Sequence, residues 1–256
     1  MDLASVIGLA IAFTSVLVGM ILEGGNPAAL ISPSAFMIVI PTTLAVAMAG
    51  GYLKDMKGVI AAVKGALMTK THDSSESIEL MVQFAEKARR EGLLALEEAV
   101  KDVEDPFLKK GIEMAVDGTD PEELREILEA EISAKKAHDK VPIAYMTGAG
   151  GYAPTIGIIG TVLGLVHVLH NLSDAASLGP SISAAFIATL FGVGTANLIY
   201  LPLATKMKRI AEGEAHHMEA IVEGIVAIQA GSNPRVIQQK LSAYLGVAPE
   251  AKDKAA

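Results

Sequence analysis

Two threonines, Thr161 and Thr189, place hydroxyl groups deep in the most apolar part of the chain. This part runs from Ala153 to Lys206 and contains no Lys or Arg before its last residue. A hydroxyl at such depth either donates to a carbonyl of its own helix or provides an oxygen atom to a passing ion. Both roles fit the sequence, so we expect the two threonines to satisfy their own helices or to border an ion path.

Carboxylates, which a proton or cation relay needs, are absent from both apolar segments of this stretch. The histidines are poorly placed to replace them. His167 and His170 fall near the outer end of the first segment, where packing or interfacial roles are expected, and the adjacent His216 and His217 point about 100° apart on a helix, which is poor spacing for metal ligands. We expect no cofactor and no metal site. An ion that crosses beside these segments needs a carboxylate from a partner protein.

A second candidate set consists of four charged residues on either side of Gly92, namely Arg89, Arg90, Glu97 and Glu98. They lie within residues 54–140, a segment that mixes 14 basic with 20 acidic residues. Interspersed charges of both signs indicate a solvated helical surface with complementary patches, and they argue against nucleic acid as a partner. On charge content alone, these four residues would belong to that solvated face.

The two apolar segments of the 153–206 stretch each carry a stripe of small residues at helical spacing. The first stripe consists of Pro154, Gly157, Thr161 and Gly164, and the second of Ala185, Thr189, Gly192 and Ala196. Small residues let helix backbones approach closely in lipid, where hydrophobicity alone does not drive association. We therefore expect the two helices to line a shared interface, with Pro202 following the second stripe.

The elements that hold these residues are predicted to be membrane-spanning helices. Hydrophobic residues make up 51% of the 256 residues, which is high for a soluble chain. A run of about 20 apolar residues can cross a bilayer, and such runs occur near residues 3–22, 34–53, 145–169 and 182–203. The sequence thus predicts an all-α membrane protein with four transmembrane helices.

Basic residues predict how these spans are oriented. All 21 Lys and Arg residues fall in two segments, with 14 in residues 54–140 and 7 in residues 206–254. Basic loops stay on the cytoplasmic side of a membrane, so both segments and both termini are expected in the cytoplasm. The expected organisation is spans one and two (1–53), a cytoplasmic helical domain (54–144), spans three and four (145–203) and a cytoplasmic helical tail (204–256).

Several local signals predict where helices begin and end. Asp120-Pro121 and Asn233-Pro234 each combine an N-cap residue with a proline at the first helical position. The helix that starts at Pro121 is expected to end or bend near Pro142. The stretch after Lys54 is expected to continue the second span as a plain helix rather than to lie along the membrane surface.

Several motifs resemble those of the A subunit of the bacterial flagellar stator, the MotA/PomA family. They are SIELMVQFAEKARREGLLALEE in the charged segment, APTIGIIGTVLGLV in the third span, ATLFG and LPLATK in the fourth, and NPRVIQQKLSAYL near the end. The resemblance covers nearly the whole chain.

This resemblance implies a subunit of the flagellar motor in the bacterial inner membrane. Such a subunit forms an ion channel with a B subunit and converts ion flow into torque on the rotor. The family arrangement is a homo-oligomeric ring of five A subunits around two single-span B subunits of the MotB/PomB type, whose membrane aspartate carries the ion. Cytoplasmic charges of the ring then push the rotor protein FliG.

The resemblance also assigns roles to residues of this chain. The rotor-interacting charges correspond to Arg89, Arg90, Glu97 and Glu98, and the residues of the ion path and of torque generation correspond to Pro154, Thr161, Thr189 and Pro202. The transported ion is H⁺ or Na⁺. Thr161 matches the sodium-type pattern, whereas Ala188-Thr189 stands where sodium-type members have two threonines, and on balance Na⁺ is favoured.

Two other interpretations remain. An ExbB/TolQ-like energiser of the cell envelope usually has three spans and an outside N-terminus, which the predicted topology opposes. A small-molecule transporter is opposed by the lack of charged residues in the spans and of symmetric halves. An enzyme is not expected, because no nucleophile, base or metal set converges.

Overall fold

The computed structural model describes residues 3–68, 74–173 and 175–246, and every regular element in these residues is a helix. The helices form two compact units. The first lies within residues 1–70 and 139–210, and the second within residues 71–138 and 211–256. The all-α class predicted from the sequence is confirmed. The part of the expected cytoplasmic tail that follows Gly246 lies outside the described residues.

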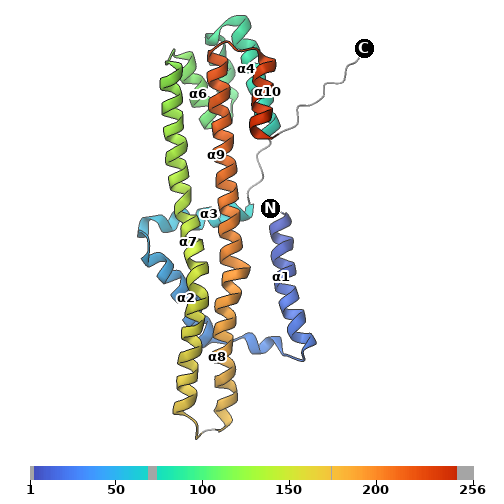
Figure 1. Cartoon of the computed structure of the whole chain (residues 1–256), viewed down its shortest axis with the longest axis vertical. Coiled ribbons are helices and arrows are strands. Elements are labelled where there is room, and N and C mark those ends of the chain that lie inside the picture. Colours follow the sequence, from blue (N-terminus) through green and yellow to red (C-terminus); the bar gives the residue numbers. More distant parts are fainter. Residues whose placement is uncertain (1–2, 69–73, 174, 247–256) are drawn as a thin grey trace. The chain divides into compact units, whose positions relative to one another are not determined.

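The first unit contains the apolar helices α1 (Leu3–Leu22), α2 (Pro33–Ala49) and α8 (Ala175–Thr195), together with part of α7 (Pro121–His170) and the start of α9 (Leu201–Gln229). A short 3₁₀ turn, η1 (Pro27–Leu30), follows α1. In this unit α7 and α8 lie side by side and α2 packs against α8 (Figure 1). Among the residues that the structure describes, three helices are long and apolar enough to cross a membrane, namely α1, α7 and the continuous helix of residues 176–229. A fourth is counted only if α2 and the helix after it form one span, so the number of four spans stays a prediction.

The second apolar segment ends earlier than predicted. After α2 the chain bends by 117° into η2 (Leu53–Asp55) and α3 (Met56–Met68). The expected continuation of one helix past Lys54 is therefore wrong. Gly50 and Gly51 lie at the bend, and each glycine lowers helix stability by about 1 kcal/mol relative to alanine. A new helical start follows at once, because the backbone N–H of Tyr52 donates to Asp55 Oδ2 at 3.4 Å.

The helix α7 is continuous over 50 residues and passes through Pro142 and Pro154. Of the two outcomes expected near Pro142, an end or a bend, the end is therefore wrong. A proline inside a helix removes one N–H donor and crowds the preceding turn. Here Pro142 is itself buried, and Met146 and Ala149 on the next turns are buried too. This packing offsets the loss of one hydrogen bond, so the helix continues.

A π turn precedes Pro202. This turn, η5 (Ala196–Tyr200), joins α8 to α9 without a break. A proline ring clashes with the carbonyl four residues before it, which here belongs to Leu198. The wider turn of a π helix provides room for that clash. The turn is well packed, since Ala196 and Tyr200 are both buried.

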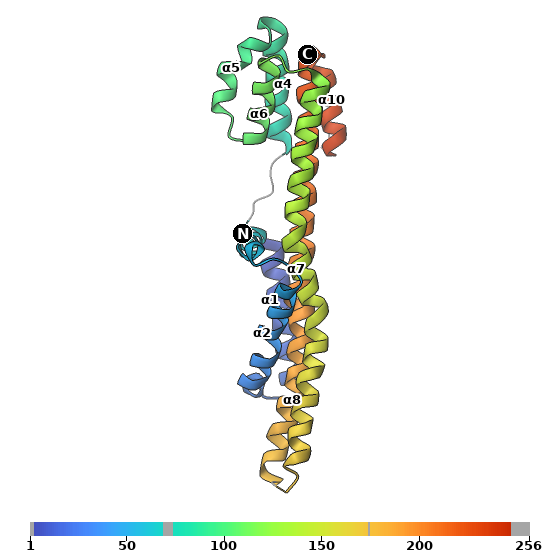
Figure 2. The ribbon, with the colours of Figure 1, turned by 90° about the vertical axis from the view of Figure 1, so that its left-hand side faces the viewer.

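The second unit is a helical bundle with its own hydrophobic core. It contains α4 (Ser74–Glu91), η3 (Leu93–Ala95), α5 (Leu96–Ala99), η4 (Val100–Asp102), α6 (Pro106–Val116) and α10 (Pro234–Leu245), with the start of α7 and the end of α9 (Figure 2). Both predicted helix starts are confirmed: Asp120 Oδ1 accepts from the N–H of Glu122 at 2.9 Å, and Asn233 Oδ1 from that of Arg235 at 3.0 Å. The largest fully buried side chains of the core include Met81, Leu96, Leu108, Ile112, Leu124, Leu128, Ile221, Ile225, Ile237 and Leu241.

Candidate functional sites

The hydroxyl groups of Thr161 and Thr189 meet between α7 and α8 and are hydrogen-bonded to each other. Thr161 Oγ1 also lies 3.1 Å from the carbonyl oxygen of Gly157 and 2.9 Å from that of Ala185. Thr161 has one hydroxyl proton, which it donates to one of these carbonyls, so the proton between the two hydroxyls comes from Thr189. Thr161 Oγ1 therefore lies within hydrogen-bonding distance of a carbonyl on each of the two helices.

This hydroxyl pair, Thr161 and Thr189, has part of what a cation needs. Each hydroxyl oxygen carries two lone pairs, and the bond between the two threonines uses one of those on Thr161. Hard cations are bound by oxygen ligands, and both side chains are half-buried. Two neutral hydroxyls nevertheless supply few ligands and no charge. A cation held here requires a further, negatively charged ligand.

Small residues bring α7 and α8 close enough for this bridge. A Cβ atom added to Gly157 would lie 2.9 Å from the carbonyl oxygen of Ala188, and one added to Gly164 would lie 2.6 Å from the Cβ of Ala185. Such separations are shorter than packed atoms tolerate, so a side chain at either glycine would push the helices apart. Of the small residues predicted to line a shared interface, Gly157, Gly164, Ala185 and Gly192 do so.

The structure does not bring the two prolines to the hydroxyl pair. Pro154 is half-buried on α7, seven residues before Thr161, which corresponds to about 10 Å along a helix. Pro202 is exposed in the first turn of α9, thirteen residues after Thr189 and about 20 Å farther along. Pro154 shares the helix face of Thr161, whereas Pro202 belongs to the region of the π turn.

A third buried hydroxyl, that of Thr43 on α2, was not singled out by the sequence reasoning. Thr43 is fully buried, in a stripe with Ala35, Val39 and Ala47 at intervals of one helical turn. Its Oγ1 has no hydrogen-bond partner among the residues that the structure describes. The available signal was the polar Thr42-Thr43 pair directly after Pro41 inside an apolar run.

The four charged residues around Gly92 lie together in the second unit. Arg89 and Arg90 occupy the last turn of α4, and Glu97 and Glu98 the first turn of α5. Between them Gly92 has φ of 86°, a conformation that favours glycine, and it turns the chain so that α4 contacts both η3 and α5. The segment after Gly92 is a short α helix between two 3₁₀ turns.

All four of these side chains are exposed, and they are held only weakly. Arg90 and Glu91 are 4.0 Å apart, as are Lys101 and Glu98. Within residues 3–68, 74–173 and 175–246, no ion pair involves Arg89 or Glu97. We call Arg89, Arg90, Glu97 and Glu98 the four exposed charges. Their side chains are exposed to solvent and make few ionic contacts within the bundle.

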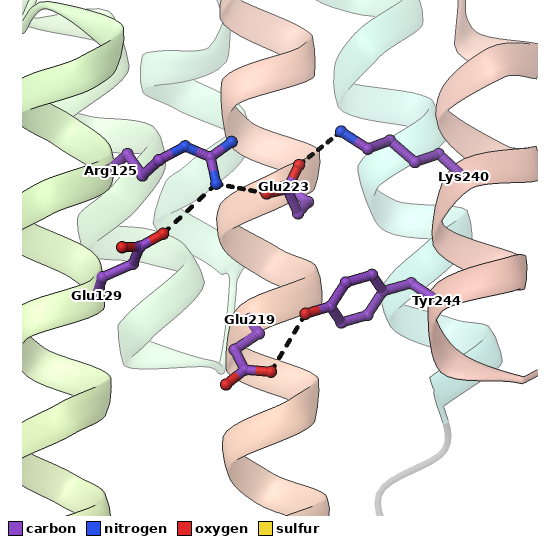
Figure 3. Close-up of polar contacts among 6 residues, drawn as sticks. All are labelled: Arg125, Glu129, Glu219, Glu223, Lys240 and Tyr244. Atoms are coloured by element: carbon purple, nitrogen blue, oxygen red, sulfur yellow. Dashed lines mark hydrogen bonds and ion pairs between the residues drawn. The ribbon is translucent and has the colours of Figure 1, made fainter.

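Other charged residues hold this bundle together. Arg125 on α7 pairs with Glu223 on α9 and with Glu129, while Lys240 on α10 donates to the second oxygen of Glu223 at 2.5 Å (Figure 3). The Arg125 guanidinium, aided by the Lys240 ammonium, lowers the pKa of Glu223 to about 2, although partial burial acts in the opposite direction. Glu223 therefore stays ionised and joins three helices.

A second set of polar contacts lies on α9 one turn before Glu223. Glu219 accepts from the hydroxyl of Tyr244 on α10 at 3.2 Å (Figure 3). It also accepts from Lys136 on α7 at 2.5 Å. The hydrogen bond from Lys136 is the main cause of the lowered pKa of Glu219. The sequence shows that Glu219 and Glu223 are one helical turn apart, but it does not show which residues of α7 and α10 lie beside them.

Comparison with known proteins decides the family. Two family models match: the motility protein A N-terminal model covers residues 6–92, and the MotA/TolQ/ExbB proton channel family model covers residues 99–220. Motility protein A of Bacillus subtilis is 39% identical over 246 residues, which is 96% of this chain and 91% of that protein. The chain belongs to the motility protein A family. Chemotaxis protein PomA of Vibrio alginolyticus is 32% identical over 245 residues, with 96% of each chain covered.

Solved structures of motility protein A complexes share the fold. The C. jejuni MotAB structure has a TM-score of 0.92 at 36% identity, with 96% of each chain covered. The flagellar MotAB stator complex of Bacillus subtilis has a TM-score of 0.89 at 39% identity, covering 95% of this chain and 96% of that one. This motility protein A homologue is thus a stator subunit of the flagellar motor, a channel protein that converts ion flow into torque. The match to the motility-specific N-terminal model favours this role over an ExbB/TolQ-like energiser.

Proposed function

We propose that this stator subunit crosses the bacterial inner membrane four times, with both termini in the cytoplasm, and that five copies surround single-span B subunits of the MotB/PomB type. The apolar helices of the first unit and the confinement of all 21 basic residues to residues 54–140 and 206–254 support this topology. The bent segment α2–α3 then provides the second span, with its bend near the cytoplasmic surface.

The hydroxyl pair between α7 and α8 is the observation that carries the proposed mechanism. Thr161 and Thr189 supply oxygen atoms at membrane depth, but no acidic residue occurs in the apolar helices α1, α2 and α8 or in residues 145–169 of α7. A cation in a low-dielectric region requires a compensating negative charge. The aspartate of the B subunit provides this charge, and the transported ion is Na⁺ rather than H⁺.

Force then passes to the rotor protein FliG through the four exposed charges. Their exposure and weak internal pairing support this role, because charges in contact with water steer and orient a partner. The stabilising ion pairs of the bundle lie elsewhere, at Glu223 and Glu219. Different charged residues of this unit thus stabilise the bundle and contact the rotor.

The carboxylate part of the proposal is tested by ion uptake into vesicles. Vesicles that contain this chain alone should not take up ions, and vesicles that also contain the B subunit should. A B subunit whose membrane aspartate is replaced by asparagine serves as the control and should restore assembly without uptake. Uptake by this chain alone would contradict the proposal, because the ion would then not need a carboxylate from a partner.

The rotor part is tested by charge reversal. Arg89→Glu and Glu97→Lys should leave the amount of assembled stator unchanged and lower torque at high load, and a complementary reversal in FliG should restore part of it. Glu113→Lys, at an exposed position on α6, is a control at which reversal should have no effect. Normal torque in both test variants would place the rotor contact elsewhere.

A further inference from the structure

The most exposed large apolar side chain in the described part of the second unit lies among the four exposed charges. Leu94 is 73% exposed, whereas the next such residues, Val236, Ile127 and Tyr244, are 55%, 39% and 37% exposed. One exposed leucine is ordinary on a protein surface. Leu94 is significant because it lies in the middle of the four exposed charges, two residues after Gly92 and three before Glu97.

The local backbone turns Leu94 away from the core. Leu96 is fully buried, and Leu93 packs against the core of the bundle. These two residues are three apart, and in a 3₁₀ turn side chains three apart are aligned. By the same spacing, Leu94 is aligned with Glu97 on the outer face. The turn is held by the N–H of Ala95, which donates to the carbonyl of Gly92 at 3.2 Å.

We propose that Leu94 is the apolar anchor of the surface that contacts the rotor protein. This inference rests on the proposed function and adds the chemistry of the partner. The partner surface must contain an apolar pocket for Leu94, with an acidic side chain on the border that faces Arg89 and Arg90 and a basic side chain on the border that faces Glu97 and Glu98.

The anchor and the charges contribute different properties to this contact. Exposed charges raise the rate of encounter and select its orientation, but they remain solvated and add little to the lifetime of the complex. An apolar side chain that enters a pocket at the centre of an interface loses its contact with water and lengthens that lifetime. A stator that transmits force at high load needs the second property as well as the first.

The test uses the full chain with its B subunit in cells whose motors are held near stall, and it measures how long each stator unit stays engaged with the rotor. Leu94→Ser should shorten the engaged time about 10-fold, which corresponds to about 1.4 kcal/mol. Leu94→Met keeps an apolar side chain and should retain most of the engaged time. Val236→Ser is the matched control, because it removes an exposed apolar side chain from α10 of the same unit, and it should have no effect.

Each outcome separates the anchor from the rest of the proposal. Because Leu94 is exposed, Leu94→Ser should accumulate and melt like the wild type, and Leu94→Gln gives a second polar variant if it does not. Normal engagement of these polar variants, combined with low torque of Arg89→Glu, overturns the anchor and leaves the charged surface in place. Normal torque of the charge variants as well would overturn the proposed rotor surface together with the anchor. An equal loss in Val236→Ser would also overturn the anchor, because the effect would not be specific to this position.

Discussion

Replacement of Gly157 by alanine should separate the two helices that hold the hydroxyl pair. The new Cβ would lie 2.9 Å from the carbonyl oxygen of Ala188 and 3.2 Å from the Cα atoms of Thr189 and Gly192. All three contacts are with the backbone of α8, so no side chain can rotate out of the way. The helices must move apart, and the bonds that Thr161 makes to α8 must lengthen.

The size of this effect follows from two opposing terms. Overpacking of this kind costs about 1–3 kcal/mol, whereas the higher helix propensity of alanine contributes about 1 kcal/mol in the favourable direction. Gly151→Ala is the matched control, because Gly151 lies on the same helix and nothing is within 4 Å of the Cβ it would gain. The control receives the favourable term alone, so the two variants should differ in stability by about 1–3 kcal/mol.

The assay is thermal unfolding of the assembled stator in lipid nanodiscs, followed by ion uptake into vesicles. Gly151→Ala should melt at or above the temperature of the wild type and take up ions normally. Gly157→Ala should melt below both and lose uptake, since the hydroxyl pair is displaced. Equal melting temperatures and equal uptake of the two variants would refute the reasoning, because the close approach of α7 and α8 would then not be needed.

Three further predictions concern single side chains. In a sodium-driven motor, Thr161→Ala should raise the Na⁺ concentration needed for half-maximal swimming speed. Thr155→Ala is the control and should not raise it, because it removes an exposed hydroxyl bonded only to its own helix at 2.8 Å. Equal responses of the two variants would contradict a role of Thr161 as a sodium ligand. Pro154→Ala adds an N–H donor within α7, so it should raise the melting temperature while slowing rotation at all loads, and unchanged speed would refute a role in torque. Because the pKa of Glu223 is lowered to about 2 from 4.5, its carboxylate stabilises the bundle above pH 4.5 and this contribution is lost as the pH falls through 2. After allowance for solvent screening, Glu223→Gln should lower the free energy of unfolding of the bundle by about 1–2 kcal/mol at pH 7. Hydrogen exchange of α9 and α10 should show that this difference from the wild type shrinks below pH 4.5. A difference that does not depend on pH would rule out this ion pair as the cause.

Much of the helix pattern could be predicted because its causes are local. Apolar length identified the long apolar helices, and the pairs Asp120-Pro121 and Asn233-Pro234 start helices through contacts with their own next residues. The glycine stripe on α7 was readable for the same reason, since helical spacing alone places Gly157 and Gly164 on one face.

The remaining features depend on tertiary packing, which local patterns do not contain. Pro142 was expected to end a helix, but its effect is overcome by the burial of the proline itself and of Met146 beyond it. The bond between Thr161 and Thr189 requires the register of two helices, as do the partners of Glu223. Sequence spacing identified the hydroxyls as candidates for a bond to their own helix or for an ion path. It did not show that Thr161 also contacts Thr189 and a carbonyl of α8.

The π turn before Pro202 changes the direction in which the side chains that follow it point around the helix axis. A π turn contains about one residue more than an α turn, so the residues after Tyr200 are rotated by about 100° from where an uninterrupted α helix would place them. In an alignment of relatives, such a turn is equivalent to a one-residue insertion. Deletion of one residue within η5 should therefore restore α geometry and leave Leu203, Ala204 and Met207 facing the core in which they are now buried, whereas conversion of the turn to α geometry without a deletion would rotate them out of it.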